Sequence, residues 1–185
     1  MKHLLLVLSG PSGVGKGTVV KHLLQDGNYA LSVSCTTRAP REGEKDGEAY
    51  FFISKEEFLN MIENGGLLEY SNHFENYYGT PKKFVEDKLK DYDVILEIEV
   101  DGALQAKKSY PDAVLIMLLP PSVEELHNRL EKRHSETEDK IEARMKRMAY
   151  EVSKKAEYDY VVINDDLQST IKEIENIIER ERGLK

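Results

Sequence analysis

Residues 4–16 read Leu-Leu-Leu-Val-Leu-Ser-Gly-Pro-Ser-Gly-Val-Gly-Lys, an apolar run followed by a glycine-rich loop and a lysine. Glycines let the backbone curl so that its N–H groups point at phosphate oxygens, and Lys16 adds a positive charge for β and γ phosphates. An ordinary glycine-rich turn is the alternative, but a strand, loop, lysine and helix in this order favour a phosphate-binding P-loop. The residues predicted to hold the phosphates are Gly10, Pro11, Ser12, Gly13, Val14, Gly15, Lys16, Gly17 and Thr18.

The residue after the lysine departs from the usual P-loop pattern. A Ser or Thr normally stands there and supplies a hydroxyl ligand to Mg²⁺, whereas this chain has Gly17, with Thr18 one residue later. Two alternatives stay open for Mg²⁺: a contact with Thr18, or coordination through the ATP phosphates and water. Binding of the nucleotide itself does not depend on this choice.

Short apolar runs separated by helical stretches predict an α/β fold with a parallel sheet. Leu4–Leu8 and Val114–Leu119 are continuously apolar, which is typical of strands covered by helices on both faces, and an all-α fold would not explain them. Strands are predicted at 4–8, 29–33, 94–100, 114–119 and 160–163, and helices near 16–26, 55–64, 81–90, 101–108, 122–132, 138–156 and 168–182.

Three of these helix starts are marked by capping residues. Ser54 and Ser122 are each followed three residues later by a glutamate, which is the capping-box spacing. Thr80 precedes Pro81, so Thr80 is the predicted cap of a helix with proline at its first position.

Two segments differ from the α/β pattern. Residues 36–74 are rich in turns, contain the strand-like stretch 50–53, and are predicted to be an insertion that folds over the sheet edge. Residues 131–147 are almost wholly charged and therefore do not suit a core, so we expect a mobile, solvated flap there.

The composition limits the classes of protein. The chain has 185 residues, 34 acidic and 26 basic, and its formal charge of −8 argues against a general nucleic-acid binder. One cysteine, Cys35, cannot form an internal disulfide, and we expect neither a leader nor a membrane span, because no such apolar run is recognisable. We expect one domain in the cytoplasm with no nucleic-acid or membrane partner, and the oligomeric state, monomer or homodimer, stays open.

Two carboxylates stand at the end of a predicted strand. Strict alternation puts Glu97 and Glu99 on one face of that strand, and a half-exposed strand with a solvated side is the ordinary explanation. Ligands of doubly wound sheets, however, bind beyond the carboxyl ends of strands, where Glu99 and Asp101 would emerge beside the P-loop. Carboxylates there could hold Mg²⁺ through water or accept hydrogen bonds from a second substrate.

Arginines gather in two places. Arg38 and Arg41 precede Tyr50 and the run 77–80, a combination that suits a phosphate dianion, although pairing with neighbouring glutamates would also explain it. The second cluster consists of Arg129, just before the charged segment, and Arg133, Arg144 and Arg147 within it. Arginines on a closing lid can neutralise a phosphoryl group in transfer, whereas Glu–Arg pairing along a helix would account for some of them.

Other catalytic arrangements are missing from the sequence. No Ser-His-Asp or Cys-His arrangement and no Cys/His zinc cluster is recognisable, and Cys35 has no adjacent partner. This absence is consistent with phosphoryl transfer between nucleotides, because an acceptor phosphate is already a nucleophile and needs positioning more than a base.

Several motifs together resemble the guanylate kinase family. They are Ser9-Gly-Pro-Ser-Gly-Val-Gly-Lys16, Ser34-Cys-Thr-Thr-Arg38-Ala-Pro-Arg41-Glu-Gly-Glu44, 47–51, Tyr77-Tyr78-Gly79-Thr80, 96–102, 120–122, 129–133, 136–138 and 162–165. They follow the family's order and cover essentially the whole chain. The resemblance implies one domain with a P-loop core (1–35, 91–125, 151–185), a mixed α+β GMP-binding segment (36–90) and a helical lid (126–150).

The resemblance also implies roles for particular residues. Arg38, Arg41, Tyr50 and Tyr78 would bind the GMP phosphate, Ser34, Glu69 and Thr80 would read guanine, and Glu44, Glu97 and Glu99 would complete the substrate site. Lys16, Arg38, Arg133 and Arg144 would be catalytic, with Arg129 near ATP and Asn164 by the adenine. A carboxylate such as Glu69 suits the two adjacent donors of guanine, whereas adenine presents an acceptor at N1.

The implied activity is ATP-dependent phosphorylation of GMP, and of dGMP, with Mg²⁺. A non-catalytic guanylate-kinase-like module that binds phosphopeptides is the alternative, but retention of Lys16, Arg133 and Arg144 weighs against it. A sugar-phosphate kinase would not need a guanine reader. Departures from the family pattern are Gly17, Glu97 and Glu99 where Asp is common, Asp101 where Gln is frequent, and His134-Ser135 in the lid.

Overall fold

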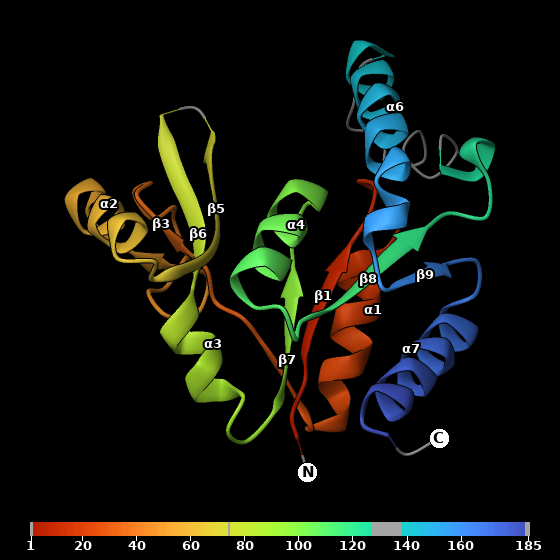
Figure 1. The fold of residues 1–185 in the computed structure, drawn as a ribbon. Coiled ribbons are helices and arrows are strands. Elements are labelled where there is room, and N and C mark those ends of the chain that lie inside the picture. Colours follow the sequence, from red (N-terminus) through yellow and green to blue (C-terminus); the bar gives the residue numbers. More distant parts are fainter. Residues whose placement is uncertain (1, 74, 127–137, 184–185) are drawn as a thin grey trace.

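The computed structural model describes residues 2–73, 75–126 and 138–183, without the side chains of 138–141 and 144. Five parallel strands form the main sheet in the order β2 (Tyr29–Leu31), β7 (Asp93–Glu97), β1 (Leu5–Ser9), β8 (Val114–Leu119) and β9 (Tyr160–Ile163). The helices that accompany it are α1 (Lys16–Leu23), α4 (Val100–Ser109), α6 (Glu138–Ser153) and α7 (Leu167–Glu181), with short 3₁₀ turns at Leu24–Asp26 and Lys155–Glu157. The predicted parallel α/β fold is confirmed (Figure 1).

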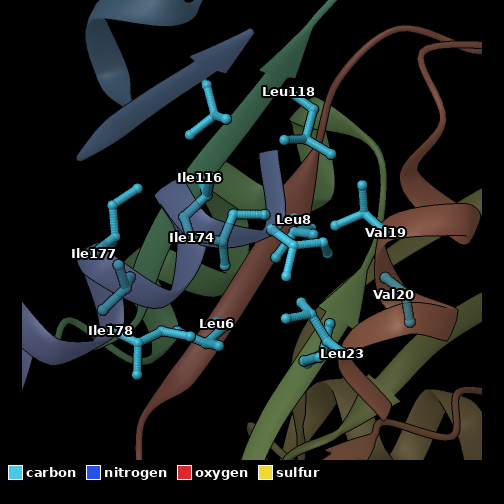
Figure 2. Packing of buried hydrophobic residues seen from close by; sticks show 14 of the residues in the cluster. Leu6, Leu8, Val19, Val20, Leu23, Ile116, Leu118, Ile174, Ile177 and Ile178 are labelled. Carbon is cyan, nitrogen blue, oxygen red and sulfur yellow. The ribbon is translucent and has the colours of Figure 1, made fainter. Parts of the chain in front are cut away.

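Helices cover both faces of this sheet because its central strands are apolar throughout. Alternate residues of β1 point to opposite faces, so Leu6 and Leu8 pack against α1 and α7 while Leu5 and Val7 pack against α4. Figure 2 shows the first of these layers, where leucines and isoleucines of β1 and β8 contact the apolar faces of α1 and α7. The sheet is therefore buried, and its carboxyl edge is left open to ligands.

Residues 35–81 form a second sheet with a small core of its own. Its strands run in the order β4 (Phe51–Phe52), β3 (Cys35–Thr36), β6 (Asn76–Pro81) and β5 (Leu67–His73), flanked by α2 (Lys55–Glu63) and followed by α3 (Lys82–Lys88). Cys35, Phe58 and Leu67 are buried together. The antiparallel β5–β6 pair was not predicted, because β5 alternates weakly and is specified mainly by its partner strand. Figure 1 shows this sheet and α6 on either side of α4.

Two of the three predicted caps are present. The Ser54 hydroxyl accepts from the Glu57 N–H at 3.1 Å, and the Ser122 hydroxyl accepts from the Glu125 N–H at 3.0 Å. The prediction that Thr80 caps a helix was wrong: β6 continues through Pro81, α3 begins at Lys82, and no side chain caps it. The extended backbone instead directs the Thr80 hydroxyl at Glu69.

The strand predicted at 94–100 ends earlier, at Glu97, and Val100 already begins α4. Glu99 stands at the N-cap position of α4, so the assignment of Glu97 and Glu99 to one strand face was wrong. Both carboxylates nevertheless lie at the carboxyl edge of the sheet, because the chain turns there into α4. Helical backbone also begins after Ser122, and the rest of the helix predicted at 122–132 lies outside the described residues.

Much of the charged segment 131–147 also lies outside the described residues, and α6 accounts for the remainder. In the described part of the chain, no helix combines the length and apolar character needed to span a membrane.

Candidate nucleotide-binding site

The glycine-rich loop between β1 and α1 has positive φ at Gly10, Gly13 and Gly15, a backbone that only glycine adopts without strain. Gly10 has φ +142°, and a Cβ there would lie 2.1 Å from the Leu118 carbonyl oxygen of the neighbouring strand. Gly15 has φ +104° at the N-cap of α1. The loop therefore lies tightly over the sheet edge and opens directly onto a helix N-terminus, the geometry that binds phosphate.

Lys16 extends over this loop. Its ammonium group donates to the carbonyl oxygens of Gly10 at 2.6 Å and Pro11 at 3.2 Å. Burial lowers its pKa, while the carboxylates of Glu151, Glu97 and Glu99 act in the opposite direction. An open pocket of about 410 Å³ lies over the loop and is lined by Ser12, Gly13, Gly15, Lys16, Gly17, Thr18 and Glu97.

Asn164, which follows β9, connects the loop to the last helix by hydrogen bonds. Its carboxamide nitrogen donates to the Val14 carbonyl at 2.7 Å, and its oxygen accepts from the Thr170 hydroxyl of α7 at 3.0 Å. The side chain is buried against Gly15. Besides any contact with an adenine, Asn164 thus ties the P-loop to the last strand and helix.

We expect Gly15→Ala to destabilise the fold by about 2–4 kcal/mol, because strain at φ +104° adds to overpacking. The added Cβ would lie 2.6 Å from Asn164 Nδ2. Gly27→Ala is the matched control: its φ is +72° with nothing within 4 Å of a Cβ, so it should cost about 1 kcal/mol. Urea unfolding measures both variants, and equal losses would contradict the packing role of Gly15.

A second pocket, of about 350 Å³, lies between the small sheet, the start of α4 and α6. Its wall consists of Ser34, Tyr50, Glu69, Ser71, His73, Tyr78, Gly79, Glu97, Ile98, Glu99, Asp101, Gly102, Gln105 and Arg147. Glu97 also lines the P-loop pocket, so the two pockets adjoin at this carboxylate. The sequence does not predict a role for Ser71, His73 and Gln105, since they lie on β5 and α4 with no motif around them.

Glu69 is the buried carboxylate of this second pocket. It is 8% exposed, and its Oε1 accepts a hydrogen bond from the Thr80 hydroxyl at 2.6 Å. Burial raises the pKa of Glu69, and the hydrogen bonds from Thr80 oppose the shift. The close approach of α4 depends on Gly102, where a Cβ would lie 3.1 Å from Glu69 Oε2. Such a carboxylate can recognise a ligand with two adjacent N–H donors.

Arg38 stands beside the aromatic end of this pocket. Its guanidinium donates to both oxygens of Glu44 at 3.0 Å, and Glu44 also accepts from the Arg41 N–H at 2.7 Å. The Glu44 hydrogen bonds raise the pKa of Arg38. The guanidinium also lies over the ring of Tyr50 at 5.6 Å. Glu44 thus holds Arg38 in place next to Tyr50, rather than lining the pocket.

The family model described as guanylate kinase matches residues 2–181 of this chain. The chain belongs to the guanylate kinase family. It is 50% identical over 182 residues to a guanylate kinase of Clostridium tetani, covering 98% of this chain and 88% of the relative. It is 52% identical over 184 residues to that of Clostridioides difficile, covering 98% and 90%.

The likeness extends to a solved structure. A crystal structure of guanylate kinase from Anaplasma phagocytophilum superposes with a TM-score of 0.71 at 38% identity, covering 97% of this chain and 86% of that one. The resemblance drawn from the motifs is therefore confirmed, over nearly the full length of the chain.

The P-loop pocket contains oxygen ligands of the kind that Mg²⁺ prefers. Thr18 and Glu97 both line that pocket. The Glu97 carboxylate lies 3.6 Å from where a Cβ of residue 17 would stand, an ordinary van der Waals distance, so Glu97 lies beside the start of α1. These two side chains are the candidates for ordering the ion, directly or through water.

The second arginine cluster is only partly described. Arg129 and Arg133 lie outside the described residues, and Arg144 stands on α6 with an undescribed side chain. Arg147 is described and reaches the second pocket, where it donates to Asp101 at 2.7 Å. Tyr150 and Glu151, which the sequence reasoning missed, accompany it on the same helix. Their spacing of three and four residues from Arg147 was the available signal.

Proposed function

We propose that this protein transfers the γ-phosphoryl group of ATP to GMP, giving ADP and GDP. The observation that carries the proposal is the adjoining of two pockets at Glu97, one over a P-loop and one containing the buried pair Glu69–Thr80. Family membership over residues 2–181 supports the same activity. An in-line transfer needs donor and acceptor to meet in this way.

ATP is held, on this proposal, by backbone N–H groups of the P-loop and by Lys16, which stabilises the charge that develops on the transferring group. Mg²⁺ supplies further neutralisation of the phosphates when it is bound. Thr18 and Glu97 are the residues that would order it. The family resemblance adds Arg129 beside ATP, and Arg133 and Arg144 as lid cations that neutralise the phosphoryl group.

GMP occupies the second pocket on this proposal. Glu69 accepts from guanine N1–H and the exocyclic amine, while Ser34 and Thr80 complete the recognition of the base. Arg38 and Arg41, with the Tyr50 and Tyr78 hydroxyls, bind the phosphate, and Glu44 fixes the orientation of the Arg38 guanidinium. A planar guanidinium held in this way can bind phosphate oxygens in pairs.

Three parts of the chain have different proposed roles. We propose that residues 36–90 act as the GMP-binding segment, 126–150 as the lid, and the remainder as the core, with closure of both segments on substrate. The formal charge of −8 supports small-molecule partners over nucleic acid, and the family's role in nucleotide supply supports a cytoplasmic location.

The test is consumption of ATP with Mg²⁺ in the presence of GMP, dGMP, AMP, UMP or ribose 5-phosphate. We expect turnover with GMP and dGMP at least about 10³-fold above AMP in kcat/KM, because adenine leaves the Glu69 carboxylate unpaired. If the folded protein phosphorylates none of these acceptors, the kinase proposal is overturned and a phosphopeptide-binding module that uses Arg38 and Arg41 is favoured. Turnover with ribose 5-phosphate alone would indicate a sugar-phosphate kinase.

A further inference from the structure

The second pocket, the proposed GMP site, is lined by more negative than positive charge. The described residues in its wall include four carboxylates, Glu69, Glu97, Glu99 and Asp101, against one permanent cation, Arg147. GMP brings a doubly charged phosphate into this wall on its way to the P-loop. The carboxylates of the wall would repel this phosphate, and the repulsion is stronger where water is excluded. The position of Arg147, the cation of the wall, therefore affects how well the phosphate is accommodated.

Arg147 contacts three carboxylates, two at the start of α4 and one on its own helix, α6. Its Nη2 donates to Asp101 at 2.7 Å and to Glu99 at 3.5 Å, and its Nε donates to Glu151 at 3.3 Å. Tyr150 reinforces the arrangement, because its hydroxyl donates to the other Asp101 oxygen at 2.6 Å and its ring lies 5.0 Å from the guanidinium. The guanidinium is thereby fixed at the boundary between α4 and α6.

Glu151 connects this cluster to the phosphate loop. The residue is 4% exposed, and its Oε2 is buried with no hydrogen-bond partner in the described part of the protein. Its carboxylate acts electrostatically on both Arg147 and Lys16. Without Arg147, Lys16 would be the main cation compensating the buried Glu151 carboxylate, and less of its positive charge would be available to a phosphate.

We propose that Arg147 is a positioning residue for GMP: it neutralises Asp101, Glu99 and Glu151 so that a phosphate dianion can occupy the space beside the P-loop. This inference rests on the proposed kinase activity and adds a residue to it. Arg147 acts through the carboxylates that it contacts and need not touch the substrate. Its role is thus distinct from that of Arg38 and Arg41, which are proposed to bind the phosphate directly.

The test begins with Arg147→Gln in steady-state assays. We expect KM for GMP to rise about tenfold, because a charged wall changes local substrate concentration by at least that factor, while kcat and KM for ATP change less than threefold. Lys146→Gln removes the same charge one residue away, where Lys146 is exposed and pairs with Glu142, and should leave KM for GMP unaltered. Arg147→Lys keeps the charge and should remain within about threefold of the parent.

Two further measurements separate neutralisation from other roles. Asp101→Asn, which keeps an acceptor for Tyr150, should restore KM for GMP to within about threefold when added to Arg147→Gln. Guanosine, which carries no phosphate, should inhibit the parent and Arg147→Gln equally. An unchanged KM for GMP, a failure of the second change to rescue, or a parallel loss of guanosine inhibition would each overturn the inference. The kinase proposal would survive all three, since only inactivity of the parent chain sinks it.

Discussion

Replacement of Lys16 by methionine is expected to lower kcat for phosphoryl transfer on the order of 10²–10³-fold, the usual effect of removing one preorganised group that stabilises transition-state charge. The ammonium lies over the loop at the start of α1, where it donates to the Gly10 carbonyl and where the positive end of the helix dipole also favours an anion. Methionine keeps most of the length and the apolar stem of the side chain and removes the ammonium together with its hydrogen bonds to Gly10 and Pro11.

Folding should survive this change. Burial of Lys16 already disfavours its charged form and lowers its pKa, so removal of the ammonium relieves a desolvation cost. The buried Glu151 loses one of its compensating cations but keeps Arg147 at 3.3 Å. Loss of activity therefore reports on chemistry rather than on unfolding.

The measurement is kcat with saturating ATP and GMP, together with thermal unfolding followed by circular dichroism. Lys21→Met is the matched control, because Lys21 stands exposed on the same helix. A Lys16→Met enzyme that kept kcat within threefold of the parent would contradict the role assigned to Lys16.

Glu69→Gln is expected to lower kcat/KM for GMP on the order of 10³-fold, since two hydrogen bonds to a charged acceptor, each worth about 1.5–3 kcal/mol, are disrupted. Glutamine keeps the shape and the Thr80 contact but turns an amide N–H₂ toward the amine of guanine, donor against donor. AMP, whose N1 is an acceptor, should lose little. The preference for GMP should therefore collapse while KM for ATP stays within about twofold.

Kinetic constants for GMP, AMP and ATP measure this effect, and Glu86→Gln on the exposed face of α3 is the control. Equal losses toward GMP and AMP would refute the assignment of Glu69 to the guanine base.

The ionisation of Glu69 adds a pH dependence to the same prediction. Burial raises the pKa of this carboxyl above its ordinary value of about 4.3. The ionised form accepts from guanine, so affinity for guanosine should be lost as the pH falls through the raised pKa and should reach a plateau above it. Guanosine is the right probe, because its lack of a phosphate removes a second titration from the range. In Glu69→Gln this dependence should disappear.

The phosphate loop shows how much a local pattern can determine. Five apolar residues, three glycines and Lys16 encode a strand, a turn and a helix start that are adjacent in sequence, so their arrangement needs no distant partner. Sequence patterning likewise predicted the parallel sheet and the helices over both its faces, because continuous apolar runs require cover on two sides.

The second pocket, in contrast, could not be predicted from any local sequence pattern. Glu69 stands on a strand that the sequence did not predict, and its burial comes from Thr80, eleven residues away, and from Gly102 of α4. Thr80 precedes a proline and has the features of a helix cap, yet the hairpin partner of β6 keeps its backbone extended. Propensity at such positions is overridden by pairing that no local window contains.

The fold class, the phosphate loop and the family are all predictable from the amino-acid sequence, because each depends on short-range order and on the number of motifs that agree. Three features of the site emerge only in the folded chain: Glu97 lines both pockets, Asn164 holds the loop and Arg147 faces three carboxylates. Charge and burial at these positions are set by segments 46 to 150 residues apart. The energy of a buried charge depends on the groups that surround it in space, and chain folding alone brings those groups together.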